Sequence, residues 1–138
     1  MAKKINDVMT KSPQTIGRDA SVVDAARVMR DADTGIVPIV DGERLLAAIT
    51  DRDVTVRIVA DGGDPNATRA FDVASRELVT VDPQQSLDEA LRLMAEHKVR
   101  RLPVCEEDGK LVGIVAQADV ARHANDERTG EVVERISS

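Results

Sequence analysis

The stretch Ile36-Val37-Pro38-Ile39-Val40-Asp41 decides the fold, because a related stretch, Leu102-Pro103-Val104-Cys105, follows in the second half of the chain. Displacing the sequence by 65 residues aligns the two prolines, and the alignment extends far upstream of them. One extra residue in the next turn changes the displacement to 66. The aligned pairs include Asp7 with Asp72, Thr15 with Thr80, Ser21 with Ser86, Ala25 with Ala90, Met29 with Met94 and Asp53 with Asp119. The chain is therefore an internal duplication, which governs every later inference about its fold.

Each copy predicts the same order of elements: strand, helix, strand, strand, helix. The first extended segments cover residues 13–16 and 78–81. Each first helix has a serine N-cap and an acidic residue three positions later, which is the capping-box spacing (Ser21 with Asp24, Ser86 with Glu89). Apolar residues at positions i, i+3, i+4 and i+7 predict one buried face per helix. These faces are Val22, Ala25, Ala26 and Met29 in one copy, and Leu87, Ala90, Leu91 and Met94 in the other.

The remaining elements complete an α+β unit. Strands are predicted at residues 36–40 and 45–49, and again at 102–105 and 111–115, each pair joined by a glycine-containing turn. A second helix begins after each hairpin. We predict two repeats, at residues 7–63 and 72–126. Because three strands and two helices bury little surface alone, the repeats should pack face to face as one pseudo-twofold module with clefts between them.

Composition limits the classes of function. The chain has 138 residues, a formal net charge of −6, one Phe and no Trp or Tyr. A negative field repels phosphate backbones, and the lack of aromatic side chains removes base-stacking platforms, so we expect neither nucleic-acid nor membrane binding. The single cysteine cannot form an internal disulfide, and no apolar run approaches the ~18 residues of a membrane span. These features predict a cytoplasmic protein.

The duplicated motifs resemble the cystathionine-beta-synthase (CBS) domain family. The resemblance rests on an ordered set of motifs that covers almost the entire chain: Val8-Met9-Thr10, Ser21-x-x-Asp24-Ala25, Ile36 to Asp41, Ile49 to Asp53, Val99 to Val104 and Leu111 to Val115. Two such copies resemble a Bateman module, here similar to stand-alone pairs without an attached enzyme. The resemblance implies a non-enzymatic regulator that binds AMP, ADP, ATP or an S-adenosyl compound between its repeats and forms a homodimer.

Thr50 and Asp53 are the first candidate ligand contacts. A hydroxyl at a helix N-terminus suits a phosphate, and a carboxylate one turn later can accept both ribose hydroxyls. The same spacing is also a capping box, so spacing alone favours a structural role. The second copy keeps Asp119 where Ala116 has replaced the capping residue, so capping alone does not explain the aspartate. The resemblance implies the ligand-binding role.

Arg100 and Arg101 form a basic pair beside a strand, with Lys98 close by. A guanidinium suits a phosphate, although a solvated charged surface is the alternative interpretation. The first copy has Gly35 and Ile36 at the equivalent positions, so we expect one strong phosphate cleft and one that is empty, weak or suited to a less charged ligand. By resemblance, Leu78, Val79 and Thr80 join the strong cleft, with simple strand propensity as the alternative for Val79. Thr15 and Asp119 would serve the weak cleft.

Other functions have weaker support in the sequence. His97, Cys105 and His123 are zinc-ligand types, but no two of them have the close spacing of a zinc motif. No phosphate loop, nucleophile elbow or paired-histidine motif indicates catalysis, and no cofactor is required. The main alternative to a ligand sensor is an interaction scaffold or stress protein whose clefts are vestigial or hold a metal. In either case an unidentified effector protein would receive the signal.

Overall fold

A computed structural model describes residues 3–123 of the chain. Residues 124–126, the end of the second predicted repeat, lie outside the described range. Residues 117–123 form a final helical segment. The other elements are α1 (Ile5–Val8), β1 (Thr10–Lys11), β2 (Ile16–Gly17), α2 (Val22–Ala32), β3 (Ile36–Asp41), β4 (Arg44–Thr50), α3 (Asp51–Asp53), the π-helix η1 (Val54–Val59), α4 (Ala70–Val73), α5 (Leu87–His97), β5 (Arg101–Cys105) and β6 (Leu111–Ala116).

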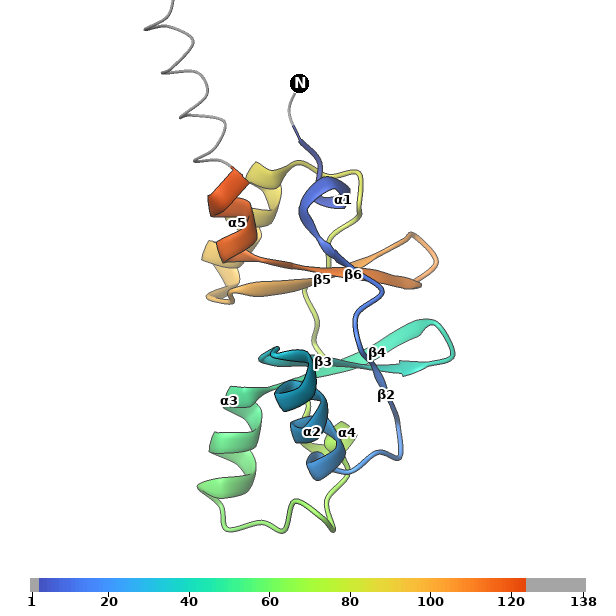
Figure 1. Ribbon diagram of the computed structural model, residues 1–138, viewed down its shortest axis with the longest axis vertical. Helices are drawn as coiled ribbons and strands as arrows, with labels where there is room; N and C mark the ends of the chain where they lie inside the picture. Colours follow the sequence, from blue (N-terminus) through green and yellow to red (C-terminus); the bar gives the residue numbers. More distant parts are fainter. Residues whose placement is uncertain (1–2, 124–138) are drawn as a thin grey trace, which may run out of the picture.

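Two three-stranded sheets lie one above the other, with helices on their outer faces (Figure 1). Their strand orders are β2-β3-β4 and β1-β6-β5. Each sheet has its own core against its helices, and a small cluster of Ile36, Ala48 and Ile114, with Leu78 packed against it, joins the inner faces. The predicted α+β fold and face-to-face repeats are confirmed.

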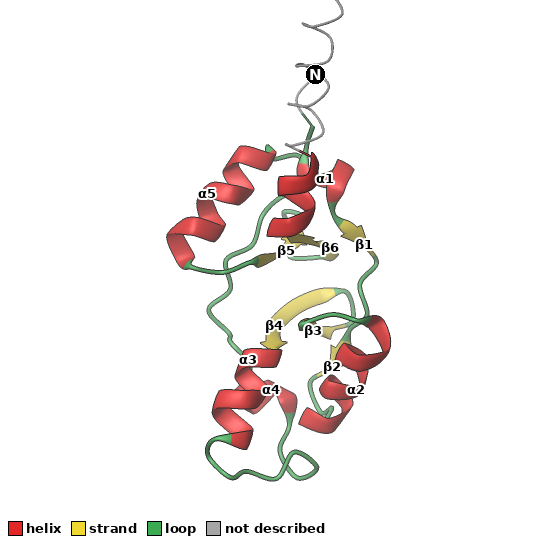
Figure 2. Cartoon of the chain, turned by 60° about the vertical axis from the view of Figure 1, so that its left-hand side comes forward, coloured by secondary structure: helices red, strands yellow, loops and turns green. Residues whose placement is uncertain are grey.

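The first segment of the chain packs on the second repeat (Figure 2). Strand β1 pairs with β6, with Thr10 opposite Ile114. The side chains of Ile5 and Val8 are buried in the core of the second repeat together with residues such as Leu102. No element was predicted at Ile5 to Val8, and the core that these side chains join belongs to residues more than seventy positions later in the chain.

In return, a segment from the middle of the chain packs on the first repeat. Helix α4 is the repeat counterpart of α1, and its Ala70 is fully buried in the core of the first repeat. Ser75, the counterpart of Thr10, pairs with Ala48 through two backbone hydrogen bonds of 3.1 and 3.2 Å. Each core is thus completed by a segment belonging to the other repeat, so the two repeats form one module.

The helix caps agree with the sequence in one copy and differ in the other. Ser21 and Asp24 form the predicted reciprocal box at the start of α2. The Ser86 hydroxyl accepts the Glu89 backbone N–H at 3.1 Å, but the Glu89 carboxylate pairs with Arg92 at 2.6 Å instead of returning to the cap. The prediction of a second reciprocal box was therefore wrong.

The predicted buried faces are confirmed except at Ala26, which is exposed. Met94 is buried, and Met29 is half-buried against the first core. The face of α2 therefore turns toward Val22, Ala25 and Met29, because η1 leaves the side of α2 near Ala26 open.

The first strands are shorter than predicted. Only Ile16–Gly17 forms a strand in the first copy, because Pro13 has no N–H to donate and the next two residues remain outside the ladder. In the second copy only Val81 pairs, in an isolated bridge to Val104. Residues 76–80 instead cross from one sheet to the other, since Ser75 pairs with the first sheet and Val81 with the second. Within residues 3–123 no helix is both long and apolar enough to cross a membrane.

Candidate functional site

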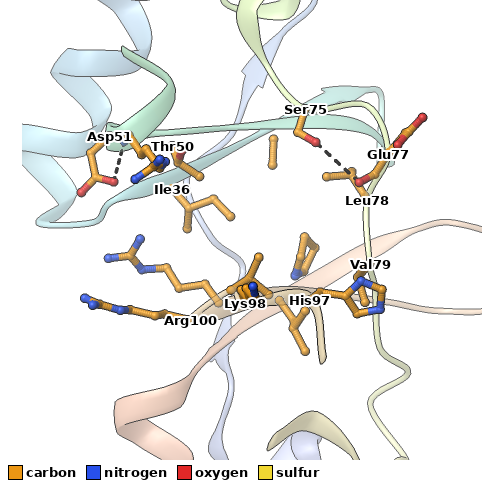
Figure 3. Close-up of a pocket in the computed structure, with 16 residues that line it drawn as sticks. Ile36, Thr50, Asp51, Ser75, Glu77, Leu78, Val79, His97, Lys98 and Arg100 are labelled. Atoms are coloured by element: carbon orange, nitrogen blue, oxygen red, sulfur yellow. Dashed lines mark hydrogen bonds between the residues drawn. The ribbon is translucent and has the colours of Figure 1, made fainter. Parts of the chain in front are cut away.

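A cavity of about 660 Å³ lies between the two sheets, where β3 begins, β4 ends and the crossing segment passes (Figure 3). Apolar side chains from both repeats cover part of its wall, namely Ile36, Ala48, Leu78, Val79, Leu102 and Pro103. Three of these side chains, Ile36, Ala48 and Leu78, also belong to the small core cluster that joins the two sheets. A cavity of this size, with both apolar and polar lining residues, has the dimensions of a small-molecule site.

Four cationic side chains line the same cavity: Arg52, Lys98, Arg100 and Arg101. Two acidic residues, Asp51 and Glu77, also line it. Within the described part of the chain, none of the four cations lies within 4.0 Å of a carboxylate, whereas surface arginines such as Arg92 are paired. Unpaired guanidinium groups at a concave surface favour a phosphate or carboxylate ligand.

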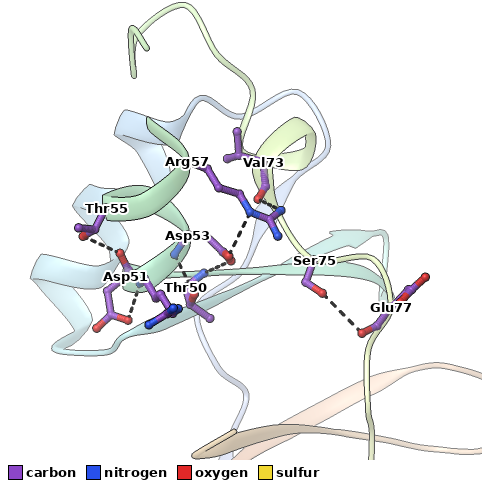
Figure 4. Close-up of polar contacts among 9 residues, drawn as sticks. Thr50, Asp51, Asp53, Thr55, Arg57, Val73, Ser75 and Glu77 are labelled. Carbon is purple, nitrogen blue, oxygen red and sulfur yellow. Dashed lines mark hydrogen bonds and ion pairs between the residues drawn. The ribbon is translucent and has the colours of Figure 1, made fainter. Parts of the chain in front are cut away.

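Thr50 brings the start of a helix to this cavity (Figure 4). Its hydroxyl oxygen accepts the Asp53 backbone N–H at 3.1 Å, and the Asp53 carboxylate accepts the Thr50 backbone N–H at 2.9 Å. The other Asp53 oxygen lies 3.9 Å from the Arg57 Nε, and Arg57 donates to the Val73 carbonyl at 2.9 Å. This chain of contacts fixes the Thr50 side chain relative to helix α4.

The structure brings together five of the nine predicted ligand contacts: Thr50, Leu78, Val79, Arg100 and Arg101 line the cavity. Asp53 does not line it. Its side chain is only 14% exposed, and its two oxygens face partners on its own helix. The structure therefore shows the cap that spacing alone favoured, and the ribose contact at Asp53 stays a prediction.

The other three predicted contacts lie elsewhere. Thr80 is exposed and lines a second cavity, which Leu78 also lines. Thr15 is exposed, Asp119 is half-buried, and neither lines the cationic cavity. Their predicted place is the opposite cleft of the pseudo-twofold arrangement, and their roles stay predictions.

Sequence reasoning did not single out Arg52 or Ser75. Arg52 lies two residues after the cap residue Thr50, and this position was a signal that could have been used. Ser75 reaches the cavity only because the crossing segment pairs with β4, and no local pattern reports that pairing.

The candidate zinc ligands do not gather. His97 lines the cationic cavity, and Cys105 lines the second cavity. The Lys3 Nζ donates a hydrogen bond of 3.0 Å to the His123 Nδ1. Among residues 3–123 no three His, Cys, Asp or Glu side chains are close enough to hold a metal ion. Cys105 is buried, as its strand position predicted, and burial raises the pKa of its thiol.

Comparison with known proteins identifies relatives over nearly the whole chain. The CBS domain family matches residues 5–60 and 70–126. Hypoxic response protein 1 of Mycobacterium tuberculosis is 39% identical over 133 residues, which cover 96% of this chain and 92% of that protein.

Solved structures show the same architecture. The crystal structure of Hypoxic Response Protein I with two coordinated zinc ions has a TM-score of 0.80 and 40% identity, and covers 88% of this chain and 98% of that one. The structure of CBSX2 in complex with AMP has a TM-score of 0.79 and 25% identity, and the match covers 91% of this chain and 98% of that one.

Proposed function

The chain belongs to the CBS domain family as a tandem pair, and we propose that it is a non-enzymatic regulatory module that binds a phosphorylated adenosine compound in the cationic cavity. The observation that carries this proposal is the set of four unpaired cations facing an apolar wall and the helix start at Thr50. The bound AMP of CBSX2 supports the ligand class.

The two sides of the cavity suit the two parts of such a ligand. Adenine is flat and largely apolar, and it fits against Ile36, Leu78 and Pro103. The phosphate groups of the ligand are negatively charged, and they complement the positive guanidinium groups of Arg100 and Arg101. Asp53 then acts as a positioning residue that holds Thr50 toward the phosphate. Binding shifts the module toward the arrangement of repeats that the ligand prefers, and an effector protein reads that arrangement.

Titration calorimetry with ATP, AMP, S-adenosylmethionine and adenosine tests the proposal. Arg100→Ala should weaken ATP and AMP about tenfold, the order expected for one charged hydrogen bond, and should change adenosine binding little. Arg44→Ala removes one exposed guanidinium that forms no ion pair with any acidic residue in the described part of the chain and does not line the cavity, so it is the matched control.

Two results would overturn the proposal. If none of the four compounds binds, the scaffold alternative replaces the sensor. If S-adenosylmethionine binds best and Arg100→Ala does not weaken it, the ligand is not a phosphorylated one. Metal analysis of the same purified samples, by mass spectrometry of the elements, separates the alternative of a metal-holding cleft, which the zinc in the Hypoxic Response Protein I structure raises.

We also propose that the module forms a homodimer through the surface made by α2 and η1. Val56 and Val59 are 47% and 69% exposed, and they are the large apolar side chains of η1 that face solvent. An apolar hollow of about 650 Å³ lies between the two helices, lined by Val22, Ile58 and neighbouring residues. Light scattering should give a dimer mass for the unaltered chain and a monomer mass for Val59→Asp. A monomer in both cases would contradict the proposal.

A further inference from the structure

The guanidinium of Arg101 lies directly against Gly35, across the boundary between the repeats. A Cβ atom placed on Gly35 would be 2.6 Å from Nη2, 2.7 Å from Nη1 and 2.8 Å from Cζ of Arg101. Arg101 is the first residue of β5 in the second repeat, and Gly35 comes directly before β3 in the first repeat. Only a residue without a side chain leaves room for the guanidinium at this point.

The glycine at this position is required for space and not for backbone conformation. Among residues 3–123 the glycines with left-handed φ values are Gly42, Gly62 and Gly109, whereas Gly35 has a conformation that other residues can adopt. In the repeat alignment, Gly35 is the counterpart of Arg100. The same position therefore supplies a cation in one repeat and an empty space for a cation in the other.

The space beside Gly35 is also the start of the helix that Thr50 caps. The Gly35 carbonyl accepts the Asp51 backbone N–H at 2.9 Å. A guanidinium held near a helix N-terminus is unfavourable on its own, because both carry positive charge. An anion between them would remove this conflict, since it could contact the guanidinium, the helix start and the Thr50 hydroxyl together.

We propose that Gly35 is a positioning residue for anion recognition: by leaving its side-chain space empty, it lets Arg101 cross from the second repeat and reach the phosphate of the ligand. This inference rests on the proposed function for the identity of its ligand. Gly35→Ala should displace only the flexible end of Arg101, so the fold stays intact while the site loses a phosphate contact.

The contact itself is tested without any ligand. NMR spectra of the free protein should show nuclear Overhauser effects between the Gly35 Hα atoms and the Arg101 side chain. In Gly35→Ala the nuclear Overhauser effects between residue 35 and the Arg101 side chain should disappear. The amide chemical shifts of the core residues should stay unchanged, which would show that the fold is intact. No contact in the unaltered protein would overturn the inference, even if nucleotides bind.

The functional consequence is tested by a double-mutant cycle on ATP and adenosine binding. Gly35→Ala should weaken ATP binding by about fivefold to tenfold and leave the affinity for adenosine unchanged. Arg101→Ala should have nearly the same effect. In the Arg101→Ala protein the further change at Gly35 should cost less than about twofold. Gly17→Ala is the matched control, because no atom lies within 4 Å of its Cβ position.

An equal loss from Gly35→Ala with and without Arg101, or a loss shared by adenosine, would overturn the inference, because Gly35 would then act through the backbone. Failure of the unaltered protein to bind any of these compounds would instead remove the proposed function. The NMR contact then decides the inference separately.

Discussion

The sulfur of Met9 occupies the space beside Gly113 where a side chain would otherwise begin. A Cβ atom on Gly113 would lie 2.6 Å from the Met9 Sδ and 2.8 Å from the Thr10 carbonyl oxygen. The repeat counterparts of Met9 and Gly113 are Ala74 and Ala47. The two contacts are therefore filled differently. One pairs the large Met9 side chain with a glycine, and the other pairs two alanines.

This complementarity predicts that Gly113→Ala destabilises the module. The Thr10 oxygen belongs to the backbone of β1, so the added methyl group must push this strand away from β6. We expect a loss of roughly 1–3 kcal/mol in the free energy of unfolding, measured with urea, as is typical of overpacking. Gly17→Ala has free space and should be neutral or slightly stabilising, so equal stability of the two variants would contradict the prediction.

The exchanged first segment predicts that Ile5→Ala weakens the second repeat first. Ile5 is fully buried in the core that contains Leu102 and Val115. Its truncation should cost about 2–5 kcal/mol, as for other large core residues, and hydrogen exchange should show β5 and β6 losing protection more than β3 and β4. Lys11→Ala, at an exposed position of β1, is the control. Greater loss in β3 and β4 would show that this segment does not dock as described.

The duplication, the hairpins and the serine caps could be predicted from the sequence because each depends on neighbours along the chain. The exchange of first segments could not. Val8 and Val73 present the same local pattern whether each packs on its own repeat or on the other one, so periodicity cannot choose between them. The choice depends on the path of the crossing segment, which is a tertiary property.

Prediction of the site divides in the same way. Thr50, Arg100 and Arg101 were found because their residue types indicate an anion and the duplication points them at one cleft. The direction of the Asp53 carboxylate could not be predicted, since the capping role and the ribose role use the same spacing. The role of Gly35 was not visible either, because it depends on a side chain that arrives from the other repeat.

Burial of Cys105 predicts a small loss of stability in alkaline solution. Burial raises the pKa of this thiol above its ordinary value of 9.0, so the folded protein keeps the proton while the unfolded chain releases it. The contribution of the protonated thiol to the free energy of unfolding is complete below that ordinary pKa. It is lost as the pH rises through the pKa of the folded protein, with a slope of at most about 1.4 kcal/mol per pH unit.

Urea unfolding of the unaltered chain and of Cys105→Ala between pH 7 and pH 10 checks this prediction. The chain has no tyrosine, so few other groups titrate in this window. The stability difference between the two proteins should shrink as the pH rises. A difference that stays constant would mean that the thiol ionises as easily in the folded protein as in the unfolded one.

The reciprocal cap at Thr50 predicts that Asp53→Ala acts through position and not through direct contact. Loss of the carboxylate should cost about 1 kcal/mol of stability, and Asp24→Ala, in the equivalent box of α2, should cost about the same. Only Asp53→Ala should weaken ATP, by a few-fold, because only this cap holds a residue that lines the cavity. Asp53→Asn keeps an acceptor for the Thr50 N–H, so it should restore both stability and ATP affinity. If Asp53→Ala and Asp53→Asn both reduce adenosine binding as much as ATP binding, the carboxylate contacts the ribose directly, and the positioning role is wrong.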